Sequence, residues 1–387
     1  EVFGYPSLRN VQKALMEPIF EGENVFGVAS TGKGKSATYQ IPAVVLGGTA
    51  IVLSPLVALM TDQVNKLKKW GIEAARLTDD MPDEDVDRII RRFNKYRLIY
   101  VAPERLKSAS FLRALENVKP SFVVIDECHL VAQAAKDFRP AFAEIGRVLG
   151  KMKKVPIMAL TATADSTQEA EITRSLRMGS YTRIVANPVR KNLEFKVYHD
   201  LEFDHLGRFL KNNFEPDDGA AIMYVSTRVR AEIGADHLKA IGLNAVPYHA
   251  GLGGTVRDRN QKLWMDGKAP IIVATNAFGM GIDKPNVRLV LHADIPGSIH
   301  DYVQEAGRAG RDGKPATCVL NVTKKGIRSR KFFIRGSNPP MRVYDACWDL
   351  WEESGKIGEA VSTNTRDMLQ RMREARVSPY DAPFMLD

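Results

Sequence analysis

The sequence predicts an α/β protein with two consecutive parallel-sheet domains and a short, mostly helical C-terminal segment. Short apolar runs rich in β-branched residues alternate with longer stretches of helical spacing, which is typical of parallel strands buried on both faces. The chain of 387 residues also exceeds the length at which one hydrophobic core usually stops growing, so two domains are expected.

The first domain is predicted over residues 1–189. Its apolar runs lie at residues 25–29, 50–54, 97–101, 122–125 and 157–160. The alternation of apolar runs and helical stretches stops at residues 186–192, which contain one proline among polar and basic residues. Because proline and polar side chains interrupt regular structure, we place the linker between the domains there.

The second domain is predicted over residues 190–323, with a sheet of similar size. Its apolar runs lie at residues 194–198, 221–225, 271–274, 289–292 and 317–322. The remaining residues, 324–387, are expected to form a basic helical extension. Residues 324–335 carry six basic side chains and no acidic one, and helical spacing continues at 343–351 and 365–376. Such a charge run is either a solvated helix face or a grip for DNA.

Composition narrows the class of protein. The net charge of +9 favours a polyanionic partner. The three cysteines are far apart and lack CxxC spacing, which argues against a disulfide framework and a cysteine-rich zinc site. There is no apolar run of about 18 residues and no signal-peptide pattern, so we expect no membrane span and a cytoplasmic location.

The strongest local signal is the segment ASTGKGKS at residues 29–36, which follows an apolar run and precedes a helical stretch. Glycines let backbone N–H groups turn around phosphate oxygens, and the helix N-terminus attracts the same anion. Lys35 is expected on the β- and γ-phosphates, and Ser36 on Mg²⁺. Ala29 departs from the strict pattern, and a glycine-rich surface turn is the alternative. The residues expected to form the loop are Thr31, Gly32, Lys33 and Gly34.

Two acidic residues follow the apolar run at 122–125. An acid at the carboxyl end of a buried parallel strand is placed to hold Mg²⁺, which we predict for Asp126. A second carboxylate, that of Glu127, can polarise the attacking water. The alternative is that such a pair only caps a helix. Cys128 and His129 come next, but no second pair completes a zinc site.

In this order and spacing the motifs resemble those of the RecQ family of superfamily 2 DNA helicases, over about residues 3–322. The resemblance implies two tandem RecA-like P-loop domains and a DExH-box ATPase. It also implies an adenine-reading element near the N-terminus, in which Tyr5 and Arg9 sandwich the base and Gln12 bonds its edge. Without the family, the same residues would be a frayed N-terminal turn.

The resemblance further implies that both domains contact a nucleic-acid strand. The segment TATA at residues 161–164 resembles the motif that links the ATP site to the path of that strand. Any one of the expected contacts is also compatible with ordinary strand-to-helix connections. The residues expected to touch the strand are Ser54, Pro55, Gln63, Arg105, Lys136, Phe138, Arg139 and Thr275.

Two late motifs in the second domain resemble elements that complete the ATP site. Gly281 and Asp283, in the segment 274–283, are expected to contact the nucleotide. Arg308 and Arg311 are three positions apart on one face of a helical turn, and the resemblance makes them arginine fingers for the γ-phosphate. The alternative is a solvated basic turn.

The function implied by the resemblance is that of an ATP-dependent 3′–5′ DNA helicase or translocase in recombination or repair. ATP and Mg²⁺ would be its cofactors, and single-stranded and forked DNA its partners. An RNA helicase on the same motor and a non-catalytic binding or annealing module remain as alternatives. We expect a monomer associated with the nucleoid of a bacterial or phage-infected cell.

Two features depart from the family. In the loop after the DExH box, the family's Trp and His positions are Ala134 and Lys136, which removes a base-stacking platform worth about 1–3 kcal/mol per base. Too few cysteines and too few residues remain for a four-cysteine zinc module and a winged-helix domain. A compact form without zinc is therefore expected.

Overall fold

The computed structural model describes residues 3–4, 7–29, 34–108, 111–112, 115, 119–133, 140–152, 155–187, 190–279, 284–337, 341 and 345. The chain divides into two compact units, each made of three segments. Unit 1 comprises Glu1–Glu194, Ala277–Arg288 and His300–Ala316, whereas unit 2 comprises Phe195–Asn276, Leu289–Ile299 and Thr317–Asp387.

The first sheet has seven strands in the order β3-β4-β2-β5-β6-β1-β7, and every neighbouring pair is parallel. Its central strands are buried, which explains their apolar, β-branched composition. The strand bounds are β1 Val25–Val28, β2 Ala50–Leu53, β3 Ala74–Leu77, β4 Leu98–Val101, β5 Val123–Asp126, β6 Ile157–Thr161 and β7 Thr182–Val185.

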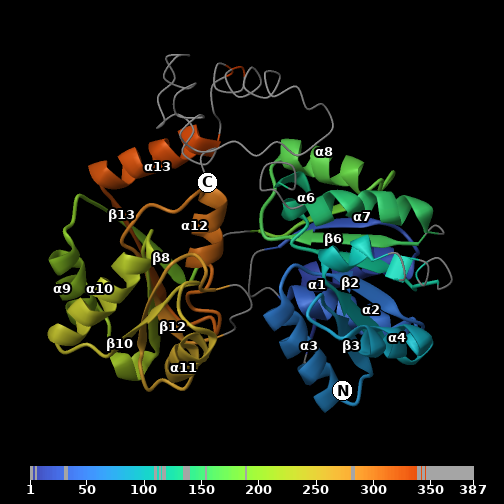
Figure 1. Ribbon diagram of the computed structural model, residues 1–387, viewed down its shortest axis with the longest axis horizontal. Helices are drawn as coiled ribbons and strands as arrows, with labels where there is room; N and C mark the ends of the chain where they lie inside the picture. Colours follow the sequence, from blue (N-terminus) through green and yellow to red (C-terminus); the bar gives the residue numbers. More distant parts are fainter. Residues whose placement is uncertain are drawn as a thin grey trace, which may run out of the picture. The chain divides into compact units, whose positions relative to one another are not determined.

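Helices cover both faces of this sheet (Figure 1). Because side chains alternate along a strand, Val124 packs on one face, whereas Val123 and Ile125 pack on the other. Helices α1 to α3 pack on the face that bears Val124, and helices α4, α6, α7 and α8 pack on the face that bears Val123 and Ile125. Their bounds are α1 Asn10–Phe20, α2 Lys35–Val45, α3 Val57–Lys69, α4 Asp83–Arg91, α6 His129–Gln133, α7 Pro140–Lys151 and α8 Ser166–Ser175, with short 3₁₀ turns η1 Phe93–Lys95 and η2 Pro103–Lys107.

The helices α7 and α8 touch closely at Gly146, where an added Cβ would strike the carbonyl oxygen of Ser175. We therefore expect Gly146→Ala to lower the free energy of unfolding by about 1–3 kcal/mol, although alanine favours a helix more than glycine. Urea denaturation measures this change. Gly150→Ala is the matched control, because its Cβ would meet only the flexible side chain of Arg177. Equal stability of the two variants would contradict this packing.

The second sheet has six strands in the order β10-β11-β9-β12-β13-β8. The pairs β10–β11, β9–β11 and β12–β13 are parallel. Its strand bounds are β8 Leu193–His199, β9 Ala220–Tyr224, β10 Ala245–Tyr248, β11 Ile271–Ala274, β12 Val287–His292 and β13 Ala316–Val322. The accompanying helices are α9 Phe203–Asn213, η3 Pro216–Asp218, α10 Arg228–Ala240, α11 Gly254–Met265, α12 Ile299–Ala306 and α13 Lys324–Ser337.

The predicted fold class is confirmed, since each of the ten apolar runs overlaps a strand of one of the two sheets. Three further strands, β3, β7 and β10, lie at sheet edges and were not predicted. The boundary predicted after residue 189 stays a prediction, because residues 188–189 lie outside the described ranges. The helical spacing at 343–351 and 365–376 falls outside them too, apart from Asp345.

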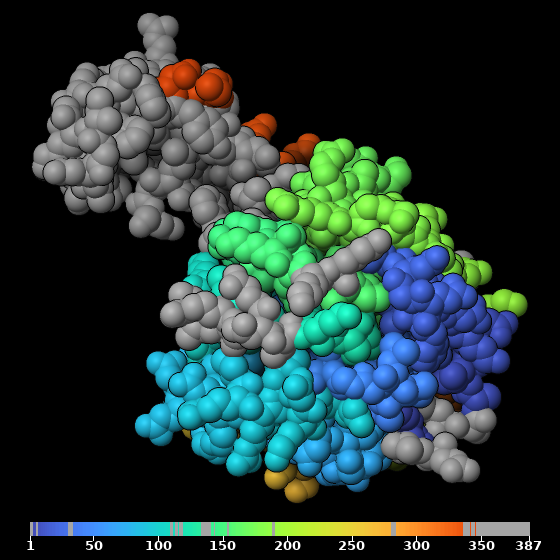
Figure 2. Space-filling view, turned by 90° about the vertical axis from the view of Figure 1, so that its right-hand side faces the viewer, coloured from blue at the N-terminus to red at the C-terminus, as the bar shows by residue number. Residues whose placement is uncertain are grey.

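The predicted basic segment forms the described helix α13, which continues from β13. Exposed basic side chains cover it, and Arg330 donates a hydrogen bond to the carbonyl of Ile295 at 2.6 Å. Phe332 and Phe333 on the same helix are exposed. Figure 2 gives the surface in space-filling form, with the early part of the chain in blue and cyan.

Within the residues that the structure describes, no helix combines the length and apolar character needed to cross a membrane. The same residues contain no group of three or more His, Cys, Asp or Glu side chains arranged to hold a metal ion. Cys128 and Cys318 are buried free thiols. Cys347 lies outside the described ranges.

Candidate nucleotide site

The predicted phosphate loop leads into α2. Gly34 precedes this helix in the left-handed conformation, with φ 76°, which glycine adopts without strain. Its carbonyl accepts a hydrogen bond of 3.2 Å from the side-chain amide of Gln12, and an added Cβ would collide with that amide. Lys35 is the first residue of α2 and Ser36 the second, so both stand at the helix N-terminus. Residues 30–33 lie outside the described ranges.

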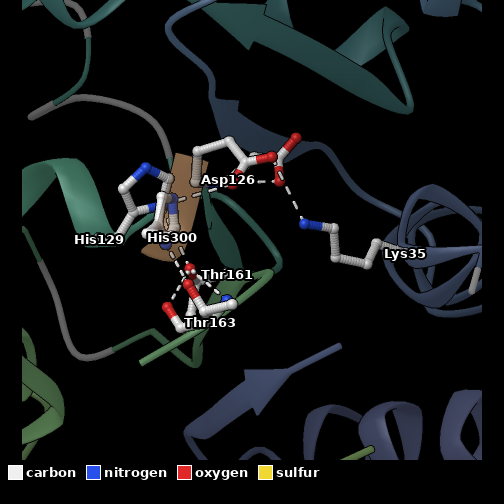
Figure 3. Close-up of polar contacts among 7 residues, drawn as sticks. Lys35, Asp126, His129, Thr161, Thr163 and His300 are labelled. Atoms are coloured by element: carbon white, nitrogen blue, oxygen red, sulfur yellow. Dashed lines mark hydrogen bonds and ion pairs between the residues drawn. The ribbon is translucent and has the colours of Figure 1, made fainter. Parts of the chain in front are cut away.

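The acidic pair lies at the carboxyl end of β5. Asp126 ends the strand, and one of its side-chain oxygens accepts a hydrogen bond from the backbone N–H of Glu127 at 3.0 Å. Glu127 is itself left-handed, with φ 52°. The Oε1 atom of Glu127 and the Nζ atom of Lys35 lie 3.4 Å apart and form an ion pair (Figure 3). The structure therefore brings together Lys35 and both predicted carboxylates, although β6 separates β5 from β1.

Burial and mutual charge set the protonation of these three groups. Burial and the negative charge of Glu127 raise the pKa of Asp126 to about 6. Burial alone would raise the pKa of Glu127, but the charges of Lys35 and His129 lower it below its ordinary value. Burial opposes the charge on Lys35, yet Glu127 and Asp126 outweigh it and raise its pKa. At neutral pH the site therefore holds one largely shielded cation and two carboxylates.

This charge balance suits a divalent metal ion. The Oε2 atom of Glu127 is buried and accepts no hydrogen bond among the described residues. The oxygens of Ser36 and Asp126 are hard donors of the kind that Mg²⁺ prefers. The side-chain donors thus fit a nucleotide-bound Mg²⁺ held by Ser36 and Asp126.

A chain of polar contacts continues from Glu127. The Nδ1 atom of His129, the first residue of α6, lies 3.5 Å from Glu127 Oε2 and 3.2 Å from the hydroxyl of Thr161. The Thr161 hydroxyl donates its only proton to the carbonyl of Thr163 at 2.9 Å. It must therefore accept from His129, which places a proton on Nδ1 of that ring.

The chain ends at His300 of α12, a residue that belongs to unit 1. Its Nδ1 hydrogen-bonds with the hydroxyl of Thr163, and its ring centroid lies 4.3 Å from that of His129 (Figure 3). Burial lowers the pKa of His300, which favours the neutral ring. Sequence reasoning missed His300 altogether and considered His129 only as a zinc ligand. The motif at 161–164 was the one signal that pointed to this chain of contacts.

The predicted adenine-reading element lies at the start of α1. Gln12 is buried, and its Oε1 accepts a hydrogen bond from the backbone N–H of Arg9 at 2.9 Å. Its Nε2 donates to Gly34, so this one amide joins the start of α1 to the phosphate loop. Base recognition by Arg9 and Gln12 stays a prediction, and Tyr5 lies outside the described ranges.

The predicted arginine fingers follow α12. Arg308 is 8 % exposed and donates to the backbone carbonyl of Gly279, whereas Arg311 is half-buried. Arg190 and Asn192 bind the carbonyl of Gly310 and so fix this segment. The predicted nucleotide contacts Gly281 and Asp283 lie outside the described ranges.

The predicted strand contacts differ in their surroundings. The hydroxyl of Ser54 is buried and lacks a hydrogen-bond partner in the described part of the chain. Arg105 is buried and donates to the carbonyls of Thr78 and Met81 at 2.9 and 3.0 Å, so it braces the loop after β3. Thr275 is buried, while Pro55 and Gln63 are half-buried. Lys136, Phe138 and Arg139 lie outside the described ranges, and every strand contact stays a prediction.

Comparison with known proteins gives two matching family models. A DEAD/DEAH box helicase model matches residues 9–171, and a helicase conserved C-terminal domain model matches residues 202–313. The ATP-dependent DNA helicase RecQ of Bacillus subtilis (strain 168) is 38% identical over 340 residues, which cover 87% of this chain and 57% of the relative.

RecQ of Haemophilus influenzae is 37% identical over 322 residues, which cover 82% of this chain and 52% of the relative. The chain thus spans somewhat more than half the length of these curated relatives. Among solved structures, the DUF1998 helicase MrfA bound to DNA is similar, with a TM-score of 0.69 and 20% identity. That match covers 83% of this chain and 50% of the other, and at this identity it concerns the fold alone.

Proposed function

The chain belongs to the RecQ family of superfamily 2 helicases, and from that premise we propose that it is an ATP-driven motor that moves 3′ to 5′ along single-stranded DNA and opens forked duplexes. The observation that carries the proposal is the ion pair of Lys35 and Glu127, whose side chains are only 12 % and 17 % exposed, beside the buried Asp126. A cation at a helix N-terminus and two carboxylates at a strand end are the groups that phosphoryl transfer to water requires.

The ion pair explains how nucleotide binding would prepare hydrolysis. Phosphate oxygens compete with Glu127 for Lys35, because they carry more negative charge than one carboxylate. Once Lys35 turns to the phosphates, Glu127 is released to accept a proton from the attacking water. Its lowered pKa keeps it ionised at neutral pH, as a base must be. Mg²⁺, held by Ser36 and Asp126, would neutralise charge on the phosphates.

The second part of the catalytic set is proposed on the motif order. Arg308 and Arg311 would stabilise the charge that develops on the γ-phosphate, with Gly281 and Asp283 beside the nucleotide. We assign residues 1–189 to the ATP-binding domain, 190–323 to the second motor domain and 324–387 to a basic extension. We also propose that the protein acts as a monomer at the nucleoid in recombination or repair; the net charge of +9 supports only its association with a polyanion such as DNA.

The proposal is tested by phosphate release from ATP and Mg²⁺, with and without single-stranded DNA, beside strand displacement on a forked duplex. We expect DNA to raise the rate several-fold and the fork to open. Stimulation should weaken with salt, with a log–log slope for DNA binding of about −0.7 per contacted phosphate.

RNA and a fork with the opposite overhang are the controls. Equal stimulation by RNA would favour an RNA helicase. Unwinding from the 5′ overhang alone would contradict the direction. An absence of hydrolysis under all conditions would leave a non-catalytic binding or annealing module.

A further inference from the structure

A buried polar cluster, separate from the acidic pair, joins helix α2 to helix α3. Its members are Tyr39 and Gln40 of α2, Tyr100 of β4 and Gln63 of α3. The first three side chains are 1 %, 2 % and 1 % exposed. Polar groups this deeply buried are costly unless each finds a partner, so their arrangement is tightly determined.

The amide of Gln40 is the centre of the cluster. Its Nε2 donates one hydrogen bond to Oε1 of Gln63 at 2.7 Å and another to the hydroxyl of Tyr100 at 3.1 Å. Both protons of this amide nitrogen are therefore used. Since Gln63 has its oxygen bound, the plane of its own amide and the direction of its Nε2 donors are fixed.

The cluster is tied to the phosphate loop through helix α2. Ser36, Tyr39 and Gln40 all belong to this helix, and the ring of Tyr39 packs edge-on against that of Tyr100, with 6.4 Å between the centroids. Burial raises the pKa of both phenols, so both stay neutral hydroxyls at any physiological pH. The hydrogen bonds of Gln40 therefore connect the helix that begins at the phosphate loop to Gln63 of α3.

We propose that Gln40 is a positioning residue that couples nucleotide binding at Ser36 to the strand contact of Gln63. This inference rests on the proposed function, in which Ser36 holds Mg²⁺ and Gln63 touches the DNA strand. Nucleotide binding engages the Ser36 hydroxyl and the first turn of α2, the helix that also carries Gln40. Because the cluster cannot lose a bond without leaving a buried polar group unpaired, the change moves α3 together with α2.

The test measures the affinity for single-stranded DNA with and without a non-hydrolysable ATP analogue and Mg²⁺. The ratio of the two dissociation constants is the coupling, which is typically about 5–150-fold in allosteric proteins. We expect this ratio to fall toward one in Gln40→Leu, which removes both donors. It should also fall in Tyr100→Phe, which keeps the ring and removes the hydroxyl that holds the Gln40 amide in place. Basal hydrolysis without DNA should stay at the wild-type rate in both.

Thr49→Val is the matched control. It removes a buried hydroxyl that bonds the carbonyls of Phe93 and Tyr96 at 3.1 and 2.7 Å, away from the cluster. It should lower stability and leave the ratio unchanged. If Gln40→Leu does not fold, Tyr100→Phe decides, because a lost hydroxyl disturbs packing least.

A wild-type ratio in folded Tyr100→Phe and Gln40→Leu would overturn this inference alone. A wild-type protein without DNA-stimulated hydrolysis would instead overturn the proposed function and the inference with it.

Discussion

Replacing Lys35 with alanine should lower ATP hydrolysis by at least about 10²–10³-fold while the protein stays folded. Lys35 is the cation that the structure places between the phosphate loop and both carboxylates, 3.4 Å from Glu127. Without it, the γ-phosphate loses its partner and the acidic pair repels the nucleotide. Phosphate release with single-stranded DNA measures the loss. Lys13→Ala, on the exposed face of α1, is the control and should keep the wild-type rate.

The same replacement should change the pH dependence of any residual hydrolysis. The charge of Lys35 is one of the causes that lower the pKa of Glu127. Its removal therefore raises that pKa, and the ionised base is then present only at higher pH. The acid limb of the pH–rate profile should therefore move to higher pH. A wild-type rate in Lys35→Ala would remove Lys35 from the catalytic site.

Replacing Glu127 with glutamine should lower the hydrolysis rate by about 10²–10⁴-fold and leave nucleotide binding intact. Glutamine keeps the shape of the side chain but cannot take a proton from water. It also removes one of the two carboxylates that compete with phosphate for Lys35. Binding of the nucleotide should therefore hold or improve, which separates this variant from Lys35→Ala.

Single-turnover hydrolysis and the affinity for a fluorescent ATP analogue measure the two effects. Glu144→Gln is the control, because Glu144 pairs with Arg147 on the surface of α7 and not with Lys35. Hydrolysis by Glu127→Gln at the rate of this control would mean that another group accepts the proton. Loss of nucleotide binding would mean that Glu127 supports the fold of the phosphate loop instead.

The buried strands were predictable because both of their faces contact a hydrophobic core. Consecutive residues of such a strand are therefore apolar, and the strand is visible as a continuous apolar run in the sequence. The run at 271–274 matches β11 residue for residue. The three edge strands that were not predicted, β3, β7 and β10, carry no such signal, whereas the edge strand β8 was predicted from residues 194–198. Residues along β7 alternate between half-buried and exposed, and β10 includes Pro247, which is tolerated at an edge but not inside a sheet.

The same contrast applies to the site. Gly34, Lys35 and Asp126 were predictable because a phosphate loop and a strand-end acid are defined by neighbours in the sequence. His300 and Gln40 act through partners far along the chain, since His300 is 137 positions from Thr163 and Gln40 is 60 from Tyr100. The residues next to His300 and Gln40 in the sequence form no motif that would indicate these contacts. Only the fold brings such pairs together.

The left-handed backbone of Glu127 sets a limit on how far this protein can be stabilised. Such a conformation costs a residue other than glycine about 1–3 kcal/mol. Glycine or asparagine would relieve most of that cost, but either would delete the carboxylate. A selection for thermal stability alone would therefore enrich inactive proteins at this position. Here the fold gives up part of its stability to aim one carboxylate, and glycine or asparagine recovers that energy only by removing the carboxylate.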